Sequence, residues 1–281
     1  MIKPSLILLN YNNYRFLPAC LASVQAQQES YKDIFFLDDN STDATLIEMS
    51  EMVVGYLPDA VIVQNATNEG VKQSLLKHLQ RNAFEWVQIL ATDDVLLEVS
   101  GITISSKNSK FDLMLADGVY LDASSNYIGG YKNYRSPQKF SMVRRDNFIL
   151  YHNPVIAPGL IFHKQNAVES LEHTDVNFED WPIVRNTLLK GGKFINLTSV
   201  KIGYRMHNNS LSSANAKHRN LLNRQIKIFL KESSMKTNSC LSKLFIYLQL
   251  RSISKESRLL KYLKVLDLNF LFWKLKKILL Y

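Results

Sequence analysis

The sequence predicts an α/β protein with a mainly parallel sheet flanked by helices and a basic helical C-terminal segment. Two observations support the sheet: short apolar runs alternate with helical periodicity in residues 1–94, and each run ends in polar residues. The third observation concerns the rest of the chain, which becomes leucine-rich and basic beyond Ala214. We therefore expect a catalytic or binding domain at 1–214 and a basic amphipathic helical region at 215–281.

The first two strands are predicted at residues 5–9 and 34–37, which are apolar runs that end in polar loops. The helix between them should begin near Tyr14 and carry apolar residues at helical spacing: Phe16, Leu17, Cys20, Leu21 and Val24. Ser41 or Thr42 is predicted to cap the next helix. The apolar face of that helix would consist of Leu46, Met49, Val53 and Leu57.

A third strand is predicted at 61–63, and the helix after it would bury Val71, Leu75, Leu76 and Leu79. The fourth strand, at 87–91, ends in Thr92-Asp93-Asp94. Ligands of parallel sheets bind beyond the carboxyl ends of the strands, so this acidic pair is expected at the rim of a site. A divalent cation would offset the repulsion between the two carboxylates. A helix N-terminus explains the same two residues equally well.

The pattern is less regular beyond residue 100. Strands are predicted at 111–116, 118–121 and 160–162, a loop at 127–136 and a helix at 140–151. Residues 177–181 are expected to open a helix that Gly191-Gly192 ends, followed by strands at 194–197 and 200–205. In the C-terminal region one helix face is defined by Leu241, Leu244, Phe245 and Leu248, and another by Leu259, Leu260, Leu263, Leu266 and Phe270.

Motifs and composition disfavour several classes of protein. No Gly-x-Gly-x-x-Gly follows a predicted strand and no Walker A pattern occurs, so a dinucleotide dehydrogenase and a P-loop NTPase are disfavoured. Two cysteines are too few for a disulfide framework. The N-terminus lacks the pattern of a secretion signal, and no apolar window approaches the roughly 18 residues of a spanning helix. We expect a cytoplasmic protein, either soluble or peripheral on the inner face of the cell membrane.

Net charge is unevenly distributed along the chain. Residues 217–281 contain 15 Lys and Arg against 3 Asp and Glu, a net +12, whereas residues 1–216 contain 19 against 22, a net −3. Basic helices with interspersed aromatic and aliphatic residues are typical of segments that bind an anionic membrane surface. A helical bundle packed on the body and a homodimer interface are alternatives. No nucleic-acid-binding motif occurs, so no nucleic acid partner is expected.

Six motifs lie at predicted strand and loop ends, and their order is informative. They are Asn10-Tyr11-Asn12, Asp38-Asp39-Asn40-Ser41-Thr42-Asp43, Asn68-Glu69-Gly70, Thr92-Asp93-Asp94, Glu179-Asp180-Trp181 and Tyr204-Arg205-x-His207-x-x-Ser210. Each is weak singly, but the ordered set resembles family 2 glycosyltransferases of the GT-A, Rossmann-like fold. The resemblance covers roughly residues 3–212.

The resemblance implies a role for each matching residue. These are, for the donor, Tyr11 and Asp39 at the nucleotide base, Lys72 near the nucleotide and Asp93 at the ribose; for a divalent metal, Mn²⁺ or Mg²⁺, Asp94 and His207; for catalysis, Asp180 as the base; and for the acceptor side, Glu179 and Trp181. From the residues alone, Asp180 could instead cap a helix and His207 could be a surface residue. Thr92 replaces the first acid of the family's usual motif, and Arg185 stands one position from the family's usual Arg.

The family implies an inverting transferase of the hexosyl or N-acetylhexosaminyl type. Its donor would be a nucleotide sugar, with UDP as the expected nucleotide, and its acceptor a hydroxyl of a glycan or lipid-linked glycan, in bacterial surface polysaccharide synthesis. The alternative is a degenerate, non-catalytic module of the same fold that binds a nucleotide or a glycan. The acids Asp39, Asp94 and Asp180, present together, favour the enzyme.

Overall fold

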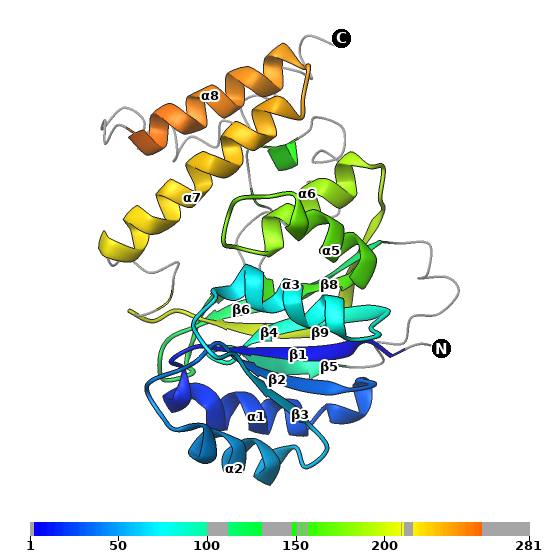
Figure 1. Cartoon of the computed structure of the whole chain (residues 1–281), viewed down its shortest axis with the longest axis vertical. Coiled ribbons are helices and arrows are strands. Elements are labelled where there is room, and N and C mark those ends of the chain that lie inside the picture. Colours follow the sequence, from blue (N-terminus) through cyan, green and yellow to red (C-terminus); the bar gives the residue numbers. More distant parts are fainter. Residues whose placement is uncertain are drawn as a thin grey trace.

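The computed structural model describes residues 3–99, 112–130, 148–150, 153, 155, 157–208, 210 and 216–254. Its centre is one nine-stranded sheet with helices on both faces (Figure 1). The strand order is β3-β2-β1-β4-β8-β6-β9-β5, and β7 pairs with β6 outside this path. The sheet is therefore mixed, with a parallel first half.

The parallel half is formed by β1 (Ser5–Asn10), β2 (Ile34–Asp38), β3 (Val61–Gln64) and β4 (Trp86–Ala91). β1 pairs in parallel with both β2 and β4, and β2 pairs in parallel with β3. All four predicted strands are confirmed. Because they run in one direction, the residues that follow their carboxyl ends meet at one edge of the sheet.

Helices cover both faces of this half. Two short turns, η1 (Tyr14–Phe16) and η2 (Gln28–Ser30), flank α1 (Leu17–Gln25), and α2 (Leu46–Tyr56) packs beside α1 on one face. On the other face α3 (Val71–Arg81) packs against α5 (Lys164–Glu172) (Figure 1). The five residues predicted as the buried face of the first helix are all buried, namely Phe16, Leu17, Cys20, Leu21 and Val24.

The cap predicted for the second helix was wrong. α2 begins at Leu46, and its N-cap is Thr45, whose hydroxyl accepts from the Glu48 N–H while the Glu48 carboxylate accepts from the Thr45 N–H. This reciprocal capping box satisfies two N–H groups that the helix itself cannot. Ser41 instead bonds to side chains at the strand ends, and Thr42 donates its N–H to Asn12.

The second half of the sheet contains β5 (Val95–Val99), β6 (Leu113–Leu121), β7 (Tyr127–Gly130), β8 (Leu160–His163) and β9 (Phe194–Arg205). β8 is antiparallel to both β4 and β6, β9 is parallel to β6, and β5 is antiparallel to β9. β5 follows Asp94 directly, so the alternative interpretation of Asp93 and Asp94 as a helix start is wrong.

Two pairs of predicted strands are single strands in the structure. Residues 113–116 of the first predicted strand and the predicted strand at 118–121 are both part of β6, and the predicted strands at 194–197 and 200–205 are both part of β9, with a register shift between Ala116 and Asp117. A bulge interrupts alternation without ending a strand, which explains the error. Residues 127–130, predicted as loop, form β7. Of the helix predicted at 140–151, residues 148–150 form a short 3-10 turn, and residues 140–147 and 151 lie outside the described residues, as do residues 131–136 of the predicted loop.

Two short turns and a helix occur in the part of the chain that contains Glu179 and Asp180. η3 (Phe148–Leu150) and η4 (Ala157–Gly159) precede β8, and α6 (Asp180–Leu189) follows α5. The prediction of α6 is confirmed, and Gly191 after it has the positive φ of +84° that a helix end often requires. α5 was not predicted, although Ala167 and Leu171 are buried at helical spacing.

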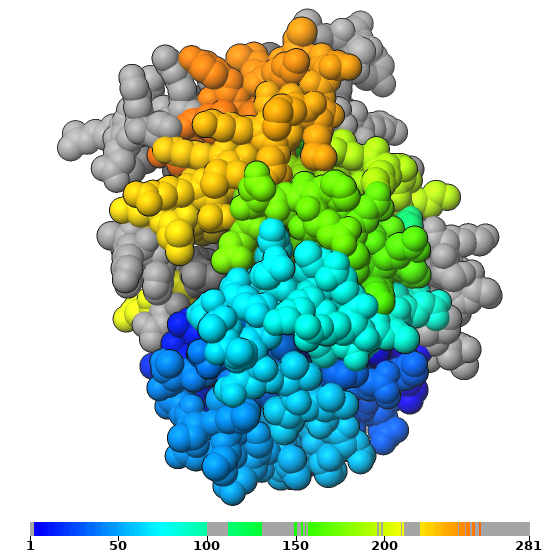
Figure 2. All heavy atoms as spheres, in the orientation of Figure 1, coloured from blue at the N-terminus to red at the C-terminus, as the bar shows by residue number. Residues whose placement is uncertain are grey.

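The C-terminal helices α7 (Ala216–Met235) and α8 (Cys240–Ser254) pack on the rest of the chain. Phe229, Leu230 and Ile246 belong to the same buried cluster as the residues between the sheet and α3, α5 and α6. Figure 2 shows the yellow and orange spheres of these helices directly against the green ones of α5 and α6. Leu244 is exposed rather than on a buried face; the face predicted at 259–270 lies outside the described residues.

Within the described ranges, no helix is both long and apolar enough to cross a membrane.

Candidate active site

A buried polar network joins the carboxyl ends of β1, β2 and β4. Asn10 Nδ2 donates to Asp38 Oδ1 at 2.7 Å and to Ser41 Oγ at 3.1 Å, and Ser41 Oγ donates to Asp38 at 2.5 Å. Thr92, fully buried, donates to Asn10 Oδ1 at 2.6 Å. A buried polar network that is satisfied in this way rigidifies its surroundings. Thr92 thus holds strand ends together.

Asp39 fixes the loop that leads from β3 to α3. Its Oδ1 accepts from Asn65 Nδ2, Ser74 Oγ and the Glu69 N–H at 2.8, 2.7 and 2.9 Å, and its Oδ2 accepts from the Gly70 N–H at 2.7 Å. Gly70, with φ of +79°, begins this turn into α3. Oδ1 thus accepts three hydrogen bonds and Oδ2 accepts one, so Oδ2 is the oxygen that has room for a further donor.

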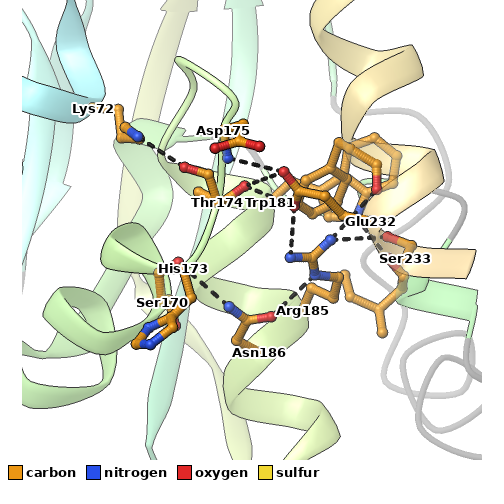
Figure 3. A network of polar contacts seen from close by, with 12 residues as sticks. Lys72, Ser170, His173, Thr174, Asp175, Trp181, Arg185, Asn186, Glu232 and Ser233 are labelled. Atoms are coloured by element: carbon orange, nitrogen blue, oxygen red, sulfur yellow. Dashed lines mark hydrogen bonds and ion pairs between the residues drawn. The ribbon is translucent and has the colours of Figure 1, made fainter. Parts of the chain in front are cut away.

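The two other residues expected at the donor differ in their surroundings. Tyr11 follows β1 directly and is 46% exposed. Lys72, in the first turn of α3, donates Nζ to the Thr174 carbonyl oxygen at 2.9 Å. Figure 3 shows Lys72 pointing toward the loop before α6.

Asp93 and His207 form a direct pair. His207 Nε2 lies 2.9 Å from Asp93 Oδ2, and the His207 ring packs on Phe16 with ring centroids 4.6 Å apart. Arg205 secures the same corner, because Nε donates to the Asp93 carbonyl oxygen at 2.6 Å and Nη1 donates to Ser125 Oγ at 2.7 Å. The end of β9 and the loop after β4 therefore share one site.

Asp94 is only 1% exposed and accepts the Arg205 N–H through Oδ1 at 2.7 Å. Burial and the neighbouring Asp93 charge raise the pKa of Asp94 well above its ordinary value, and the Arg205 N–H and guanidinium oppose that rise. A carboxyl in such a place either keeps its proton or is ionised beside a cation.

The acidic corner fits a divalent cation that a nucleotide also binds. Among the described residues, no group of three or more His, Cys, Asp or Glu forms a complete metal site. Mg²⁺ nevertheless often takes one or two carboxylates from the protein and its other ligands from phosphates and water. The paired atoms of Asp93 and His207 are 2.9 Å apart, and adjacent ligands of an octahedral ion at about 2.1 Å are separated by about 3.0 Å.

Glu179 and Asp180 stand at the start of α6. Asp180 is partly exposed; its Oδ2 accepts from Asn153 Nδ2 and its Oδ1 from the Trp181 N–H, both at 2.7 Å. Burial raises the pKa of Asp180, and these two hydrogen bonds oppose the rise. Burial and the Asp180 charge raise the pKa of Glu179 to about 8. Burial and the charge on Asp180 therefore both favour the protonated form of Glu179.

The capping interpretation of Asp180 is not supported. The N-cap of α6 is Glu179, which makes no side-chain cap hydrogen bond, and Asp180 is already helical. Trp181 lies in the core: its Nε1 donates to the Ile149 carbonyl oxygen at 2.6 Å and its ring packs on Phe178 and Phe229. Trp181 thus anchors the start of α6.

Sequence reasoning did not identify Asn153 and gave no role to Arg205. Asn153 lies far along the chain in a segment without periodicity, so no local signal marks it. Arg205 had a signal, since it precedes His207 by two residues at the end of a strand.

Comparisons with known proteins point to one class of enzyme. Residues 5–98, about a third of the chain, match the family described as Glycosyl transferase family 2. The PGL/p-HBAD biosynthesis glycosyltransferases of Mycobacterium bovis and Mycobacterium tuberculosis are 24% identical over 131 residues, which is 45% of this chain and 51% of each relative. The chain therefore spans about half the length of these curated relatives.

Two solved structures share the fold. The mannosyltransferase PcManGT from Pyrobaculum calidifontis, in complex with GDP-Man and Mn²⁺, is 14% identical, with a TM-score of 0.60 over 99% of this chain and 83% of that chain. TarS of S. aureus, in complex with UDP-GlcNAc, is 16% identical, with a TM-score of 0.55 over 89% and 70%. The fold of this chain is that of GT-A glycosyltransferases.

Proposed function

We propose that this protein transfers a sugar from a nucleotide-sugar donor to a hydroxyl group of a glycan acceptor, with inversion at the anomeric carbon. The observation that carries the proposal is the carboxylate of Asp180, a partly exposed residue: Asn153 orients this carboxylate, and it stands beside Glu179, whose pKa is raised to about 8 by burial and by the Asp180 charge. A carboxylate with a raised pKa is a stronger base than an ordinary one, and it can accept the proton of an attacking hydroxyl.

The proposed reaction needs one base. As the acceptor oxygen bonds to the anomeric carbon, its proton passes to an Asp180 oxygen. At the same time the bond between that carbon and the phosphate oxygen breaks, and the nucleoside diphosphate leaves. Attack from the side opposite the leaving group inverts the anomeric centre. Glu179 is protonated and would not compete for the acceptor proton.

The donor would bind along the carboxyl ends of β1, β2 and β4. We assign the base to Tyr11 and the free position on Asp39 Oδ2, and the ribose and diphosphate to the Asp93–His207 corner. A Mn²⁺ or Mg²⁺ ion held there with Asp94 would neutralise charge on the leaving diphosphate. Lys72 is tied to the Thr174 carbonyl, so contact with the nucleotide would require it to exchange that bond. UDP is the nucleotide we expect.

The test is a donor panel followed by one substitution. UDP-GlcNAc, GDP-Man and other nucleotide sugars are screened for a rise in Tm with Mn²⁺ and with chelator, because a ligand that binds the folded state stabilises it. Asp180→Asn should then lower turnover of the stabilising donor by at least about a hundredfold while leaving the donor-induced rise in Tm intact.

Asp175→Asn is the matched control, since Asp175 lies in the same loop with an exposed side chain. Its turnover should equal that of the natural protein. Turnover of the Asp180 variant at the natural rate would refute the base assignment. Donor binding without turnover by the natural protein would instead indicate a non-catalytic binding module.

For the acceptor we propose a lipid-linked glycan at an anionic membrane surface. One exposed stripe of α7 alternates apolar and basic side chains at spacings of three and four residues: Leu221, Arg224, Ile228, Lys231 and Met235. Such a stripe combines shallow insertion with attraction to anionic lipids. Arg224→Glu with Lys231→Glu should abolish sedimentation with phosphatidylglycerol vesicles, and unchanged sedimentation would exclude this surface. Phosphatidylcholine vesicles are the control.

A further inference from the structure

The loop between α5 and α6, residues 173–179, is held from two sides before it delivers Glu179 and Asp180. One side is the start of α3, and the other is α7, whose contacting residues lie 48 to 58 residues later in the chain. Figure 3 shows this network, with Lys72 on one side of the loop and Glu232 on the other. No motif in the sequence predicts the contacts between this loop and α7.

Glu232 makes most of the contact from α7. Its carboxylate accepts from Thr174 Oγ1 at 2.8 and 3.1 Å and from the Asp175 N–H at 2.9 Å. Hydrogen bonds to a charged acceptor are among the stronger ones in proteins. The Thr174 carbonyl oxygen accepts from Lys72 at the same time, so this residue is fixed at both its backbone and its side chain.

Gln225 makes the second contact, two helical turns before Glu232 on the same face of α7. Its Oε1 accepts from the Asn177 N–H at 2.8 Å. The Asn177 side chain lies against Gly70, because a Cβ added to Gly70 would come within 2.4 Å of Asn177 Nδ2. Gly70 is also the residue whose N–H donates to Asp39. The loop therefore packs on the donor side of the proposed site while α7 holds it in place.

Arg185 ties α7 to α6 at the same point. It is fully buried; Nη1 donates to Ser233 Oγ at 2.9 Å, Nη2 lies 3.3 Å from Glu232 Oε2, and the guanidinium carbon lies 3.8 Å from the Phe229 ring centroid. A buried ion pair does not necessarily increase the stability of a protein. Removing one partner, however, leaves the other charge buried and unpaired, which is destabilising. The Arg185 side chain therefore links α6 to α7.

We infer that α7 is part of the catalytic unit, with Gln225 and Glu232 as positioning residues that hold the 174–177 segment and hence the Asp180 carboxylate. The inference rests on the proposed function. It assigns to the C-terminal helices a role in the reaction that is separate from any contact with a membrane. A displacement of about 1 Å at a reacting group can lower a rate by about a hundredfold.

The primary test is Gln225→Ala in the full-length chain. It removes one hydrogen bond to the loop and leaves the Arg185–Glu232 pair intact. We expect faster amide hydrogen exchange at residues 174–178, and a kcat lowered by about ten- to a hundredfold with an unchanged KM for the donor. Nucleoside diphosphate release from GDP-Man or UDP-GlcNAc supplies the rates. Gln225→Glu keeps an acceptor oxygen and should restore both values.

Asn223→Ala is the matched control, because Asn223 is another half-buried amide of α7 and has no side-chain hydrogen bond among the described residues. It should behave as the natural protein does. Faster exchange in Gln225→Ala with an unchanged kcat would overturn the positioning role, as would unchanged exchange. If the natural protein turns over no nucleotide sugar of the panel, the proposed function fails, while the exchange measurement still decides whether α7 holds the loop.

Discussion

Glu179 and Asp180 illustrate how one residue sets the chemistry of its neighbour. Both carboxyls are raised in pKa by burial, but only Asp180 receives hydrogen bonds from other side-chain and backbone groups that favour its charged form. The charge on Asp180 in turn keeps the proton on Glu179. The acidic pair is therefore differentiated by a single amide side chain, Asn153, and by the Trp181 N–H in the first turn of α6.

The first prediction concerns Asn153→Ala. The Asn153 amide stabilises the Asp180 carboxylate, so its removal should raise the pKa of Asp180 further. The limb of the pH–kcat/KM profile that falls toward acid should then move to higher pH. The measurement is donor turnover between pH 4 and 9. An unmoved limb would mean that Asp180 does not govern it.

The second prediction concerns Glu179→Gln and stability. In the unfolded chain Glu179 loses its proton near pH 4.5, whereas in the folded protein it does so near pH 8. The folded state therefore holds the extra proton in this interval, and stability should fall as pH rises from about 4.5 to about 8. A glutamine side chain has no proton to lose, so the free energy of unfolding of the Glu179→Gln variant should not fall in this way. The difference in stability between the variant and the natural protein should therefore grow in favour of the variant as pH rises. Urea unfolding at pH 5, 7 and 9 measures it, with the exposed Glu51→Gln as control.

At the scale of elements, the turn from β3 into α3 joins the donor side to the loop before α6. Gly70 has a positive φ, accepts no side chain without a clash with Asn177, and directs its N–H at Asp39. Gly70 therefore adopts a backbone conformation that favours glycine, leaves space for the Asn177 side chain and donates a hydrogen bond to Asp39. This turn requires glycine for reasons that lie partly in a loop about a hundred residues away.

The third prediction compares two glycines. Gly70→Ala should destabilise the fold by more than about 1 kcal/mol, since it adds both strain and a clash, and should weaken donor binding. Gly55, in the exposed face of α2, has no atom within 4 Å of an added Cβ, so Gly55→Ala should stabilise by about 0.5–1 kcal/mol. Thermal unfolding with and without donor distinguishes the pair. Equal effects of the two substitutions would contradict both the backbone strain and the Asn177 clash at Gly70.

The parallel half of the sheet was predictable because β1, β2, β3 and β4 each combine an apolar run with a polar end. The second half was less so. β5 follows an acidic pair that marks a strand end, so Val95–Val99 was not recognised as a strand. The bulge near Ala116 interrupts the alternation of side chains, so β6 and β9 were each predicted as two strands. Local alternation does not reveal how strands far apart in the chain pair.

For the candidate site, the sequence supplied the acids but not their partners. Asp93 and His207 lie 114 residues apart, and only the pairing of β9 with β6 and β5 brings them together. Asn153 and Glu232 carry no motif. Their roles depend on hydrogen bonds to residues far away in the sequence, and local sequence patterns do not predict such contacts.

On the scale of the whole molecule, the basic region includes helices that complete a core. Phe229 and Leu230 of α7 and Ile246 of α8 are buried with residues of α5 and α6. Part of the C-terminal region thus serves the interior of the protein, and the exposed stripe of α7 is a separate face. The packed-bundle alternative for this region holds for α7 and α8.

The fourth prediction is that truncation after Ala214 gives an unstable or insoluble body. It would expose the partners of Phe229, Leu230 and Ile246, each of which contributes about 1.5–3 kcal/mol by burial, and would leave Arg185 without Glu232. Solubility and Tm measure the effect. A second truncation, after Ser254, keeps α7 and α8 as a comparison. A soluble body of natural Tm after the first truncation would contradict the shared core.

The short link between β4 and β5 dictates the curvature of the sheet. Only Thr92, Asp93 and Asp94 separate Ala91 from Val95, and such a link reaches at most about 14 Å. In the strand order, β8, β6 and β9 lie between these two strands, which in a flat sheet would place them about 19 Å apart. The sheet must therefore curl toward closure. The seam of that partial barrel is where Arg205 meets Asp93 and Asp94.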